Sequence, residues 1–412
     1  MSCREQRPAP VGGRERQWRP VADTIAPLVF VGSWQATETG GEPATADRAI
    51  VATIAGTAYD ALERDLDDWA RGGDPPLHRS GSGWRLAAPV DAWTLLRQSL
   101  TAPDIERRLA AALDVLTEID PVLSLPPAER FSAGARGIRR AWSGLLRRGI
   151  AVGIALLGAA GDERVGDRRT GEDHARRIVR AVLASANADG SGLLWKSLAD
   201  VLPLLAEAAP DEFLDAVEVA LSGSPPLLMT MFEDRSASHL GSYSPHAGLL
   251  WALETLSWAP AYLSRTTDQL ARLAEADPGW RLSNRPSDFL RRVFLPCPCT
   301  AAPSARRTAV LSGLAERRPQ AAFGLLLPLA VARGYKPRNP LASLSRLAAR
   351  LAPRELAGIP GGDHRNHRPS PASDPPGSPS MAGPSARPAW PARQPGHPVP
   401  RCSGRGDPGH PA

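Results

Sequence analysis

One short phrase recurs four times along this chain and constrains its fold more than any other feature. Each copy has a leucine, a glutamate two residues later and a proline five residues after the leucine. The copies are Leu116–Pro121, Leu205–Pro210, Leu273–Pro278 and Leu314–Pro319. Proline cannot continue a helix but fits the first turn of the next one. Each copy therefore predicts a helix end, with the leucine as its last core contact.

The chain around these copies is typical of amphipathic helices. One apolar stripe, with steps of four, four, three and three, consists of Ile105, Leu109, Leu113, Leu116 and Ile119. The copies lie 89, 68 and 41 residues apart, so they form no strict repeat. We expect a degenerate array of antiparallel helix pairs over residues 101–335. Chance recurrence in a chain rich in alanine and leucine is the alternative, and both explanations predict a mainly α fold.

Residues 20–100 predict a smaller domain with a different order of elements. The expected helices are Val21–Val31, Arg48–Ala55 capped by Asp47, Ala58–Arg71 capped by Thr57, and one from Pro89 to about Leu100. Before the last helix, Leu77–Arg79 and Trp84–Leu86 flank the glycine-bearing turn Ser80–Gly83, which predicts a β-hairpin. Three helices followed by a hairpin is the order of a winged-helix domain.

The two ends of the chain predict disorder. Residues 1–19 are rich in arginine, proline and glycine and are expected to form a loose arm. After a terminal helix remnant near Leu344–Leu351, residues 360–412 contain no leucine, isoleucine, phenylalanine or tyrosine, but 14 of the 42 prolines. Such a segment buries too little apolar surface to offset an ordering entropy of about 1–2 kcal/mol per residue. We expect residues 336–412 to be a largely disordered tail, and a change of reading frame is one hypothesis for its origin.

Several enzyme classes lack their signatures here. Of the 49 basic residues only Lys196 and Lys336 are lysines, and they follow Trp195 and Tyr335, so no Gly-Lys-Ser/Thr phosphate loop exists. The chain has no His-Glu-x-x-His and no Gly-x-Ser-x-Gly. The Cys297-Pro-Cys299 pair has no further ligands at a spacing that suits zinc. We therefore expect no catalytic residues, no cofactor and no metal site, although absent motifs leave an unfamiliar enzyme open.

Charge favours a protein partner over nucleic acid or membrane. The net charge of +6 is diffuse, because the tail from Pro360 carries +3 of it. Helix Ala58–Arg71, which would read DNA in a winged helix, has five acidic and two basic residues, so phosphates would repel it. No secretory signal and no apolar run of about 20 residues occurs, which predicts a cytoplasmic protein. The alternative is a winged-helix DNA-binding regulator with a helical effector domain.

Five residues are candidates for contact with a partner. Arg79, Trp84 and Arg85 belong to the predicted hairpin, and Trp251 and Trp258 lie seven residues apart on one helix face. Tryptophans at this spacing are more often part of a core, and we expect that here. Their alternative role is to anchor a bound protein.

Three stretches together resemble a known family. They are His78–Trp93, Tyr243–Leu256, and Arg281–Pro286 with Phe294–Pro296. They resemble the C-terminal half of large bacterial STAND-class NTPases, in which a P-loop ATPase is followed by a winged helix and a helical sensor region. The resemblance covers about Pro20–Arg333, and the ATPase module is missing from this chain.

The resemblance implies a role. It implies a non-enzymatic sensor arm of a signalling or antiviral defence system, truncated or encoded by a split gene. Its partner would be a separate ATPase module or a foreign protein. The acid-rich helix Ala58–Arg71 is compatible with this, because in the family the winged helix packs on the ATPase core.

Overall fold

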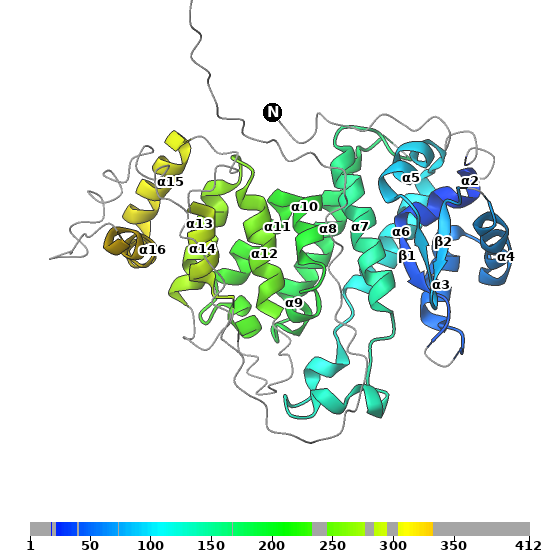
Figure 1. Cartoon of the computed structure of the whole chain (residues 1–412), viewed down its shortest axis with the longest axis horizontal. Coiled ribbons are helices and arrows are strands. Elements are labelled where there is room, and N and C mark those ends of the chain that lie inside the picture. Colours follow the sequence, from blue (N-terminus) through cyan, green and yellow to red (C-terminus); the bar gives the residue numbers. More distant parts are fainter. Residues whose placement is uncertain are drawn as a thin grey trace, which may run out of the picture. The chain divides into compact units, whose positions relative to one another are not determined.

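The computed structural model describes residues 18, 22–38, 41–72, 74–166, 168–232, 245–276, 284–294 and 304–332. These residues are mainly helical and include one small antiparallel sheet of three strands (Figure 1). The predicted tail at residues 336–412 and most of the predicted N-terminal arm lie outside the described residues. The exception is Trp18, which is only 1% exposed and donates its indole N–H to the carbonyl oxygen of Asp74 at 2.8 Å. Assigning it to a loose arm was wrong, because this large apolar side chain is buried.

The N-terminal part has more elements than the sequence predicted. They are α2 (Ala22–Ile25), the 3-10 helix η3 (Ala26–Phe30), β1 (Ser33–Gln35), α3 (Thr45–Ala55), α4 (Tyr59–Ala70), β2 (Leu77–Ser80), β3 (Gly83–Leu86) and α5 (Pro89–Leu96). The single helix predicted over Val21–Val31 is divided, and Pro27 stands in the first turn of its 3-10 half. The last helix is also shorter than expected, since a 3-10 turn over Arg97–Ser99 follows Leu96.

The sheet has the strand order β1-β3-β2. The predicted hairpin is confirmed, with Ser80 paired to Gly83 around a two-residue turn. Strand β1, which the sequence did not predict, pairs with β3 so that Trp34 lies opposite Trp84. Both tryptophans are fully buried. The indole N–H of Trp34 donates to the Tyr59 hydroxyl at 2.9 Å, which connects the sheet to α4.

Asp47 does not have the capping role that was predicted for it. Helix α3 begins before it, with Ala44 as its N-cap, and Asp47 lies buried in the first turn. Its carboxylate accepts hydrogen bonds from the backbone N–H of Gln35 at 2.8 Å and from the N–H and hydroxyl of Ser143. Asp47 therefore joins α3 to β1 and to the start of α7. The N-cap of α4 is Ala58, so Thr57 was also misassigned.

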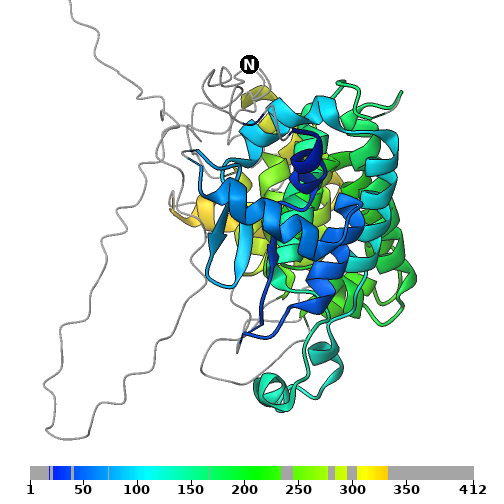
Figure 2. The same cartoon turned by 90° about the vertical axis from the view of Figure 1, so that its right-hand side faces the viewer.

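Helices continue through the rest of the described chain. They are α6 (Ala102–Leu116), α7 (Gly144–Ala160), α8 (Gly171–Ala188), α9 (Leu193–Ser197), α10 (Leu202–Ala208), α11 (Pro210–Leu221), α12 (Pro245–Ser257), α13 (Leu263–Glu275), α14 (Pro286–Phe294), α15 (Ser304–Arg317) and α16 (Pro319–Ala332). The segment between α6 and α7 projects away from the helices and contains only short 3-10 turns (Figures 1 and 2).

The recurring phrase marks helix ends, as predicted. Its four leucines, at positions 116, 205, 273 and 314, are fully buried. Helices α11 and α16 begin at Pro210 and Pro319, and Pro121 opens a 3-10 turn after α6. Helix α13 ends at Glu275, while Pro278 lies outside the described residues. The proline and the last core leucine thus mark a helix end within each copy, whatever the spacing between copies.

Two layers of helices form the centre of this region. We call α7, α10 and α12 layer A, and α8, α11 and α13 layer B. Consecutive helices pack across the layers as α7 on α8, α10 on α11 and α12 on α13. Layer A is continued by contacts of α10 with both α7 and α12, and layer B by contacts of α11 with both α8 and α13.

Helix α6 buries Ile105 and Leu116 of the expected stripe, but not the residues between them. Leu109 and Leu113 are only half-buried, and Ile119 lies beyond the helix end and is 39% exposed. The buried face instead includes Arg108, whose guanidinium lies 3.7 Å from the centre of the Phe30 ring. Among the described residues no group accepts a hydrogen bond from this guanidinium. Burial lowers the Arg108 pKa well below its ordinary value.

Candidate functional site: the exposed face of layer A

The hairpin residues proposed as partner contacts do not form one accessible surface. Trp84 is fully buried, so its inclusion among them was wrong. It belongs to the core, and it projects from the same side of the sheet as the buried Trp34 of β1, with which it is paired. Arg79 and Arg85 are exposed. The Arg79 guanidinium lies 3.9 Å from the Asp67 carboxylate of α4 and 5.8 Å from the Trp84 ring centre.

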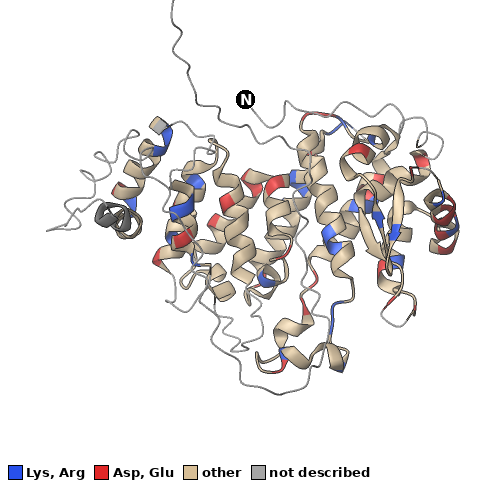
Figure 3. Ribbon diagram, in the orientation of Figure 1, with Lys and Arg blue, Asp and Glu red and all other residues tan. Residues whose placement is uncertain are grey.

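Helix α4 presents an acidic surface beside this hairpin (Figure 3). Asp60 and Asp68 have side chains that are 94% and 67% exposed. Glu63 is more covered and pairs with Arg48 of α3 at 3.3 Å. Arg79 of the hairpin lies close to Asp67 and so offsets that one negative charge of α4.

Trp251 of α12 and Trp258, which directly follows the helix end at Ser257, are exposed, and this overturns the expectation that they belong to the core. Trp251 and Trp258 are 42% and 41% exposed, although most of the helix is buried. The buried face of α12 is supplied by Leu249, Leu253 and Leu256. The opposite side of the helix, which carries Trp251, is only partly covered.

Glycines allow close contacts between the backbones of layer A. A Cβ atom on Gly158 of α7 would overlap the Ala208 carbonyl oxygen of α10, and one on Gly248 of α12 would overlap that of Ala199. Only glycine allows such close approach of two backbones. These two contacts bring α10, and the turn before it, close to α7 and α12. Leu156 of α7 and Leu204 of α10 have half-buried side chains that pack against the core.

Two carboxyl groups stand on this face, and sequence reasoning missed both. Glu254 lies between the tryptophans, three residues after the first and four before the second. Glu207 lies on α10 and is exposed, yet the surrounding protein raises the pKa of its carboxyl group. Desolvation likewise raises the pKa of Glu254, against the opposing effect of Arg292, 3.9 Å away. A search for residues at helical spacing between the tryptophans would have found Glu254.

The Glu207 carboxylate differs from that of Glu254, because no ion-pair partner for it is found among the described residues. Within the described part of the chain no hydrogen bond or ion pair is found for it, and desolvation alone accounts for its raised pKa. An exposed carboxylate in partly dehydrated surroundings favours an incoming positive charge. The layer A face thus combines apolar anchors with one acid that is free to pair.

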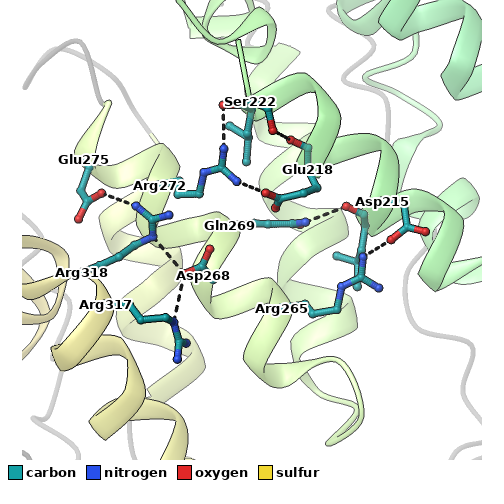
Figure 4. A network of polar contacts seen from close by, with 12 residues as sticks. Asp215, Glu218, Ser222, Arg265, Asp268, Gln269, Arg272, Glu275, Arg317 and Arg318 are labelled. Atoms are coloured by element: carbon teal, nitrogen blue, oxygen red, sulfur yellow. Dashed lines mark hydrogen bonds and ion pairs between the residues drawn. The ribbon is translucent and has the colours of Figure 1, made fainter. Parts of the chain in front are cut away.

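The corresponding surface of layer B is made of paired charges (Figure 4). Arg272 of α13 pairs with Glu218 of α11, and Gln269 donates to the Leu214 carbonyl oxygen at 2.8 Å. The remaining pairs along this layer are Arg177–Glu106, Arg180–Glu212, Arg265–Asp211, Arg265–Asp215, Arg318–Asp268 and Arg318–Glu275. Since these charges satisfy one another, layer B offers a partner few unpaired groups.

One cavity of about 390 Å³ lies between the N-terminal part and the segment that precedes α7. Its charged residues are paired: Arg139 lies 2.7 Å from Glu38, and Arg140 lies 3.0 Å from Asp120. Asp47 also lines it, with its oxygens accepting the three hydrogen bonds described above. Ser143 lines the cavity as well, and its hydroxyl both donates to the Asp47 carboxylate and accepts from the Leu146 N–H as the N-cap of α7.

Further chemistry was sought in the described part of the chain. It contains no group of three or more His, Cys, Asp or Glu side chains that could hold a metal ion. Cys297, Cys299 and Trp280 lie outside the described residues. None of the described helices is both long enough and apolar enough to cross a bilayer. Comparison with protein-family models, with curated protein sequences and with solved structures gives no match.

Proposed function

We propose that this protein is a non-enzymatic recognition arm that binds another protein through the exposed face of layer A. The observation that carries the proposal is the exposure of Trp251 on α12 and of Trp258 directly after its end. Tryptophan is enriched among the residues that contribute most to protein–protein binding, and here two of them are exposed seven residues apart. The stacked helix pairs resemble repeat arrays, whose extended faces bind proteins.

We further infer that the N-terminal part is a winged-helix domain. In support, α3 and α4 are followed by the hairpin β2–β3, and β1 completes the sheet beside β3. The exposed acids of α4 favour packing on protein over entry into a DNA groove, where phosphates would repel them. Together with the resemblance to STAND-class NTPases, this favours a cytoplasmic sensor arm whose partner is a separate ATPase module or a foreign protein.

Site-specific photo-crosslinking in the cells that naturally produce the protein tests the main proposal. A photo-reactive residue replaces Thr255, which is exposed between the two tryptophans. Ala184, exposed on α8 of layer B, provides the matched control position. We expect discrete protein adducts from position 255 and none of the same mass from position 184. Equal adducts at both positions, or none at position 255, would refute binding through layer A.

The DNA-binding alternative is tested on the purified full chain. A winged-helix regulator would bind duplex DNA with an affinity that falls steeply between 50 and 200 mM salt. Arg79→Glu and Arg85→Glu would weaken that binding further. We expect no salt-dependent duplex binding and no ATP turnover, and either activity would replace the proposal.

A further inference from the structure

We propose that the segment between α6 and α7, residues 117–143, is a second binding element, and that its Phe131 inserts into an apolar pocket of a folded protein partner. Phe131 is 86% exposed, the highest value for a large apolar side chain among the described residues. Its ring has no aromatic or cation contact within the described part of the chain. The segment projects away from the helices (Figures 1 and 2). This contact goes beyond the proposed function, because it uses neither layer A nor its tryptophans.

The base of the projecting segment is fixed to the helices. Connections longer than about 15 residues without long helices or strands are uncommon in compact domains, and the ordered ones commonly serve binding. The Glu118 carboxylate accepts from the backbone N–H of Ala141 at 2.6 Å, which joins the two ends of the segment. The Asp120 carboxylate lies 3.0 Å from the Arg140 guanidinium, and the Asp120 N–H donates to the Ser197 hydroxyl of α9 at 2.9 Å. These contacts fix the direction in which the segment leaves the helices.

The tip of the segment is held by its own contacts, which leave the Phe131 ring outside. Arg130 donates to the carbonyl oxygens of Leu123 and Leu125, both at 3.0 Å. Ala133 is only 1% exposed. Because side chains three residues apart lie on the same side of 3-10 turns, Arg130 and Ala133 mark the inner side of this run of turns, and Phe131 lies on another side. A side chain presented by an already ordered segment loses less conformational freedom on binding.

The charges of the segment indicate the kind of partner. Each of its charged side chains already has a partner: besides the contacts of Glu118, Asp120, Arg130 and Arg140 given above, the pairs are Arg136–Glu129 and Arg139–Glu38. The Arg136–Glu129 pair, at 2.8 Å, adds no net charge beside the ring. Phosphates of nucleic acid attract unpaired cations, and stable membrane anchoring needs a second signal besides one apolar group. The complement of this tip is therefore an apolar recess in a protein.

A recess suits the ring better than a flat surface does. A flat surface covers only one side of a phenyl ring, whereas a pocket removes both of its faces from water, and the residues that contribute most to binding fill such pockets. Ala128 and Gly134, three residues to either side of Phe131, are small and exposed. The walls of a pocket can thus close around the ring without meeting another large side chain at these two positions.

Photo-crosslinking with benzoylphenylalanine tests the inference, because this residue keeps an aromatic ring at position 131. It is placed in the full chain, in the cells that naturally produce the protein, at position 131. The control is position 90, where Val90 of α5 is an apolar residue that is 52% exposed. We expect a discrete protein adduct from position 131 that is absent from position 90. Mass spectrometry should locate the attachment among apolar residues of the partner.

Competition by purified chains then measures the contribution of the ring. Excess parent chain should abolish the adduct, Val90→Ala should compete as well as the parent, and Phe131→Ala should compete at least about tenfold less well. Circular dichroism should show that both variants keep their helix content. Raising the salt concentration from about 0.15 M to about 1 M should change the competition by less than about twofold, because no exposed ion pair is expected in the contact.

Several results would overturn the inference. They are the absence of a protein adduct at position 131, an adduct of the same mass at position 90, attachment to a lipid or to a second copy of the chain, and equal competition by Phe131→Ala. Competition that weakens steeply with salt would replace the apolar pocket with a charged partner. The proposed function is judged separately, by the adducts from position 255, so either proposal can fail alone.

Discussion

Layers A and B hold their helices together by different physical means. In layer A the backbones approach so closely that Gly158 and Gly248 leave no room for a side chain. In layer B the helices are joined near the surface by arginine–carboxylate pairs such as Arg272–Glu218 (Figure 4). Close packing depends on shape and is insensitive to salt, whereas exposed ion pairs are weak and screened.

This difference accounts for the surfaces that the two layers present. Layer A obtains its cohesion from buried backbone contacts, so its outward face needs few charges and can expose tryptophan. Layer B uses its outward face for helix-to-helix pairs, which leaves few of those charges for a partner. We therefore associate binding with layer A and the joining of successive helices with layer B.

The largest expected effect is on the close contact of layer A. Gly248→Ala places a Cβ atom onto the Ala199 carbonyl oxygen, and relief of the overlap requires the helices to separate. Overpacking of this kind costs about 3 kcal/mol. Urea denaturation of the full chain measures the loss. Gly190→Ala is the control, because nothing lies within 4 Å of the added atom. Equal midpoints for the two variants would contradict close packing.

A buried arginine supports layer A at its first helix. Arg147 of α7 donates to the Val115 carbonyl oxygen in the last turn of α6 at 2.6 Å and to that of Ser197 at the end of α9 at 2.9 Å. Burial lowers its pKa to about 10, so it stays charged at neutral pH. Arg147→Met leaves both carbonyls without this donor, and we expect a loss of about 2 kcal/mol in unfolding free energy.

Arg108 provides the opposite case on α6. It is as deeply buried as Arg147 but lacks a hydrogen-bond acceptor among the described residues. Replacing a buried charge with an apolar side chain of similar length commonly stabilises, so Arg108→Met should raise the unfolding free energy by about 1 kcal/mol. Denaturation of both variants under the same conditions is the measurement. If both substitutions change stability with the same sign, the role assigned to the acceptors of Arg147 is wrong.

Ion pairs of layer B should contribute less. A double-mutant cycle with Arg272→Ala and Glu218→Ala is expected to give a coupling of about 0.5 kcal/mol. Raising the salt concentration to 1 M should reduce it towards zero, because the Debye length falls to about 3 Å. A coupling above that of the layer A contact, or one insensitive to salt, would reverse the comparison of the two layers.

The free energy of unfolding should change with pH in opposite directions for two carboxylates. One is Glu106 of α6, which pairs with Arg177 of layer B, and the other is Glu207 of layer A. Arg177 lowers the pKa of Glu106 below 4.5, so the stability from Glu106 is present above pH 4.5 and is lost as the pH falls through the folded value. Desolvation raises the pKa of Glu207 above 4.5, so its contribution is complete below pH 4.5 and is lost as the pH rises through the folded value.

Thermal unfolding of Glu106→Gln and Glu207→Gln between pH 3 and 7 provides the measurement. Relative to the parent chain, Glu106→Gln should become less destabilising as the pH falls. Glu207→Gln should become more favourable as the pH rises. Parallel curves for the two variants would remove the electrostatic difference between the layers.

Local features of the fold were predictable from sequence, and some long-range ones were not. The four helix ends and the hairpin depend on proline, glycine and turn residues close together in the chain, and all those within the described residues were found as expected. Strand β1 was missed because a three-residue strand has too few positions to show a periodicity. The face of α6 was misjudged because its buried side contains Arg108, which a hydrophobicity pattern assigns to solvent.

The candidate site shows where sequence reasoning stops. The sequence by itself determined that this chain is mainly helical and where its helices end, since helix ends are set by neighbouring residues. Only the tertiary structure decided that Trp84 is covered while Trp251 and Trp258 remain exposed. The reason is physical: all three side chains gain free energy from burial, and which of them is buried depends on the distant segment that packs across it.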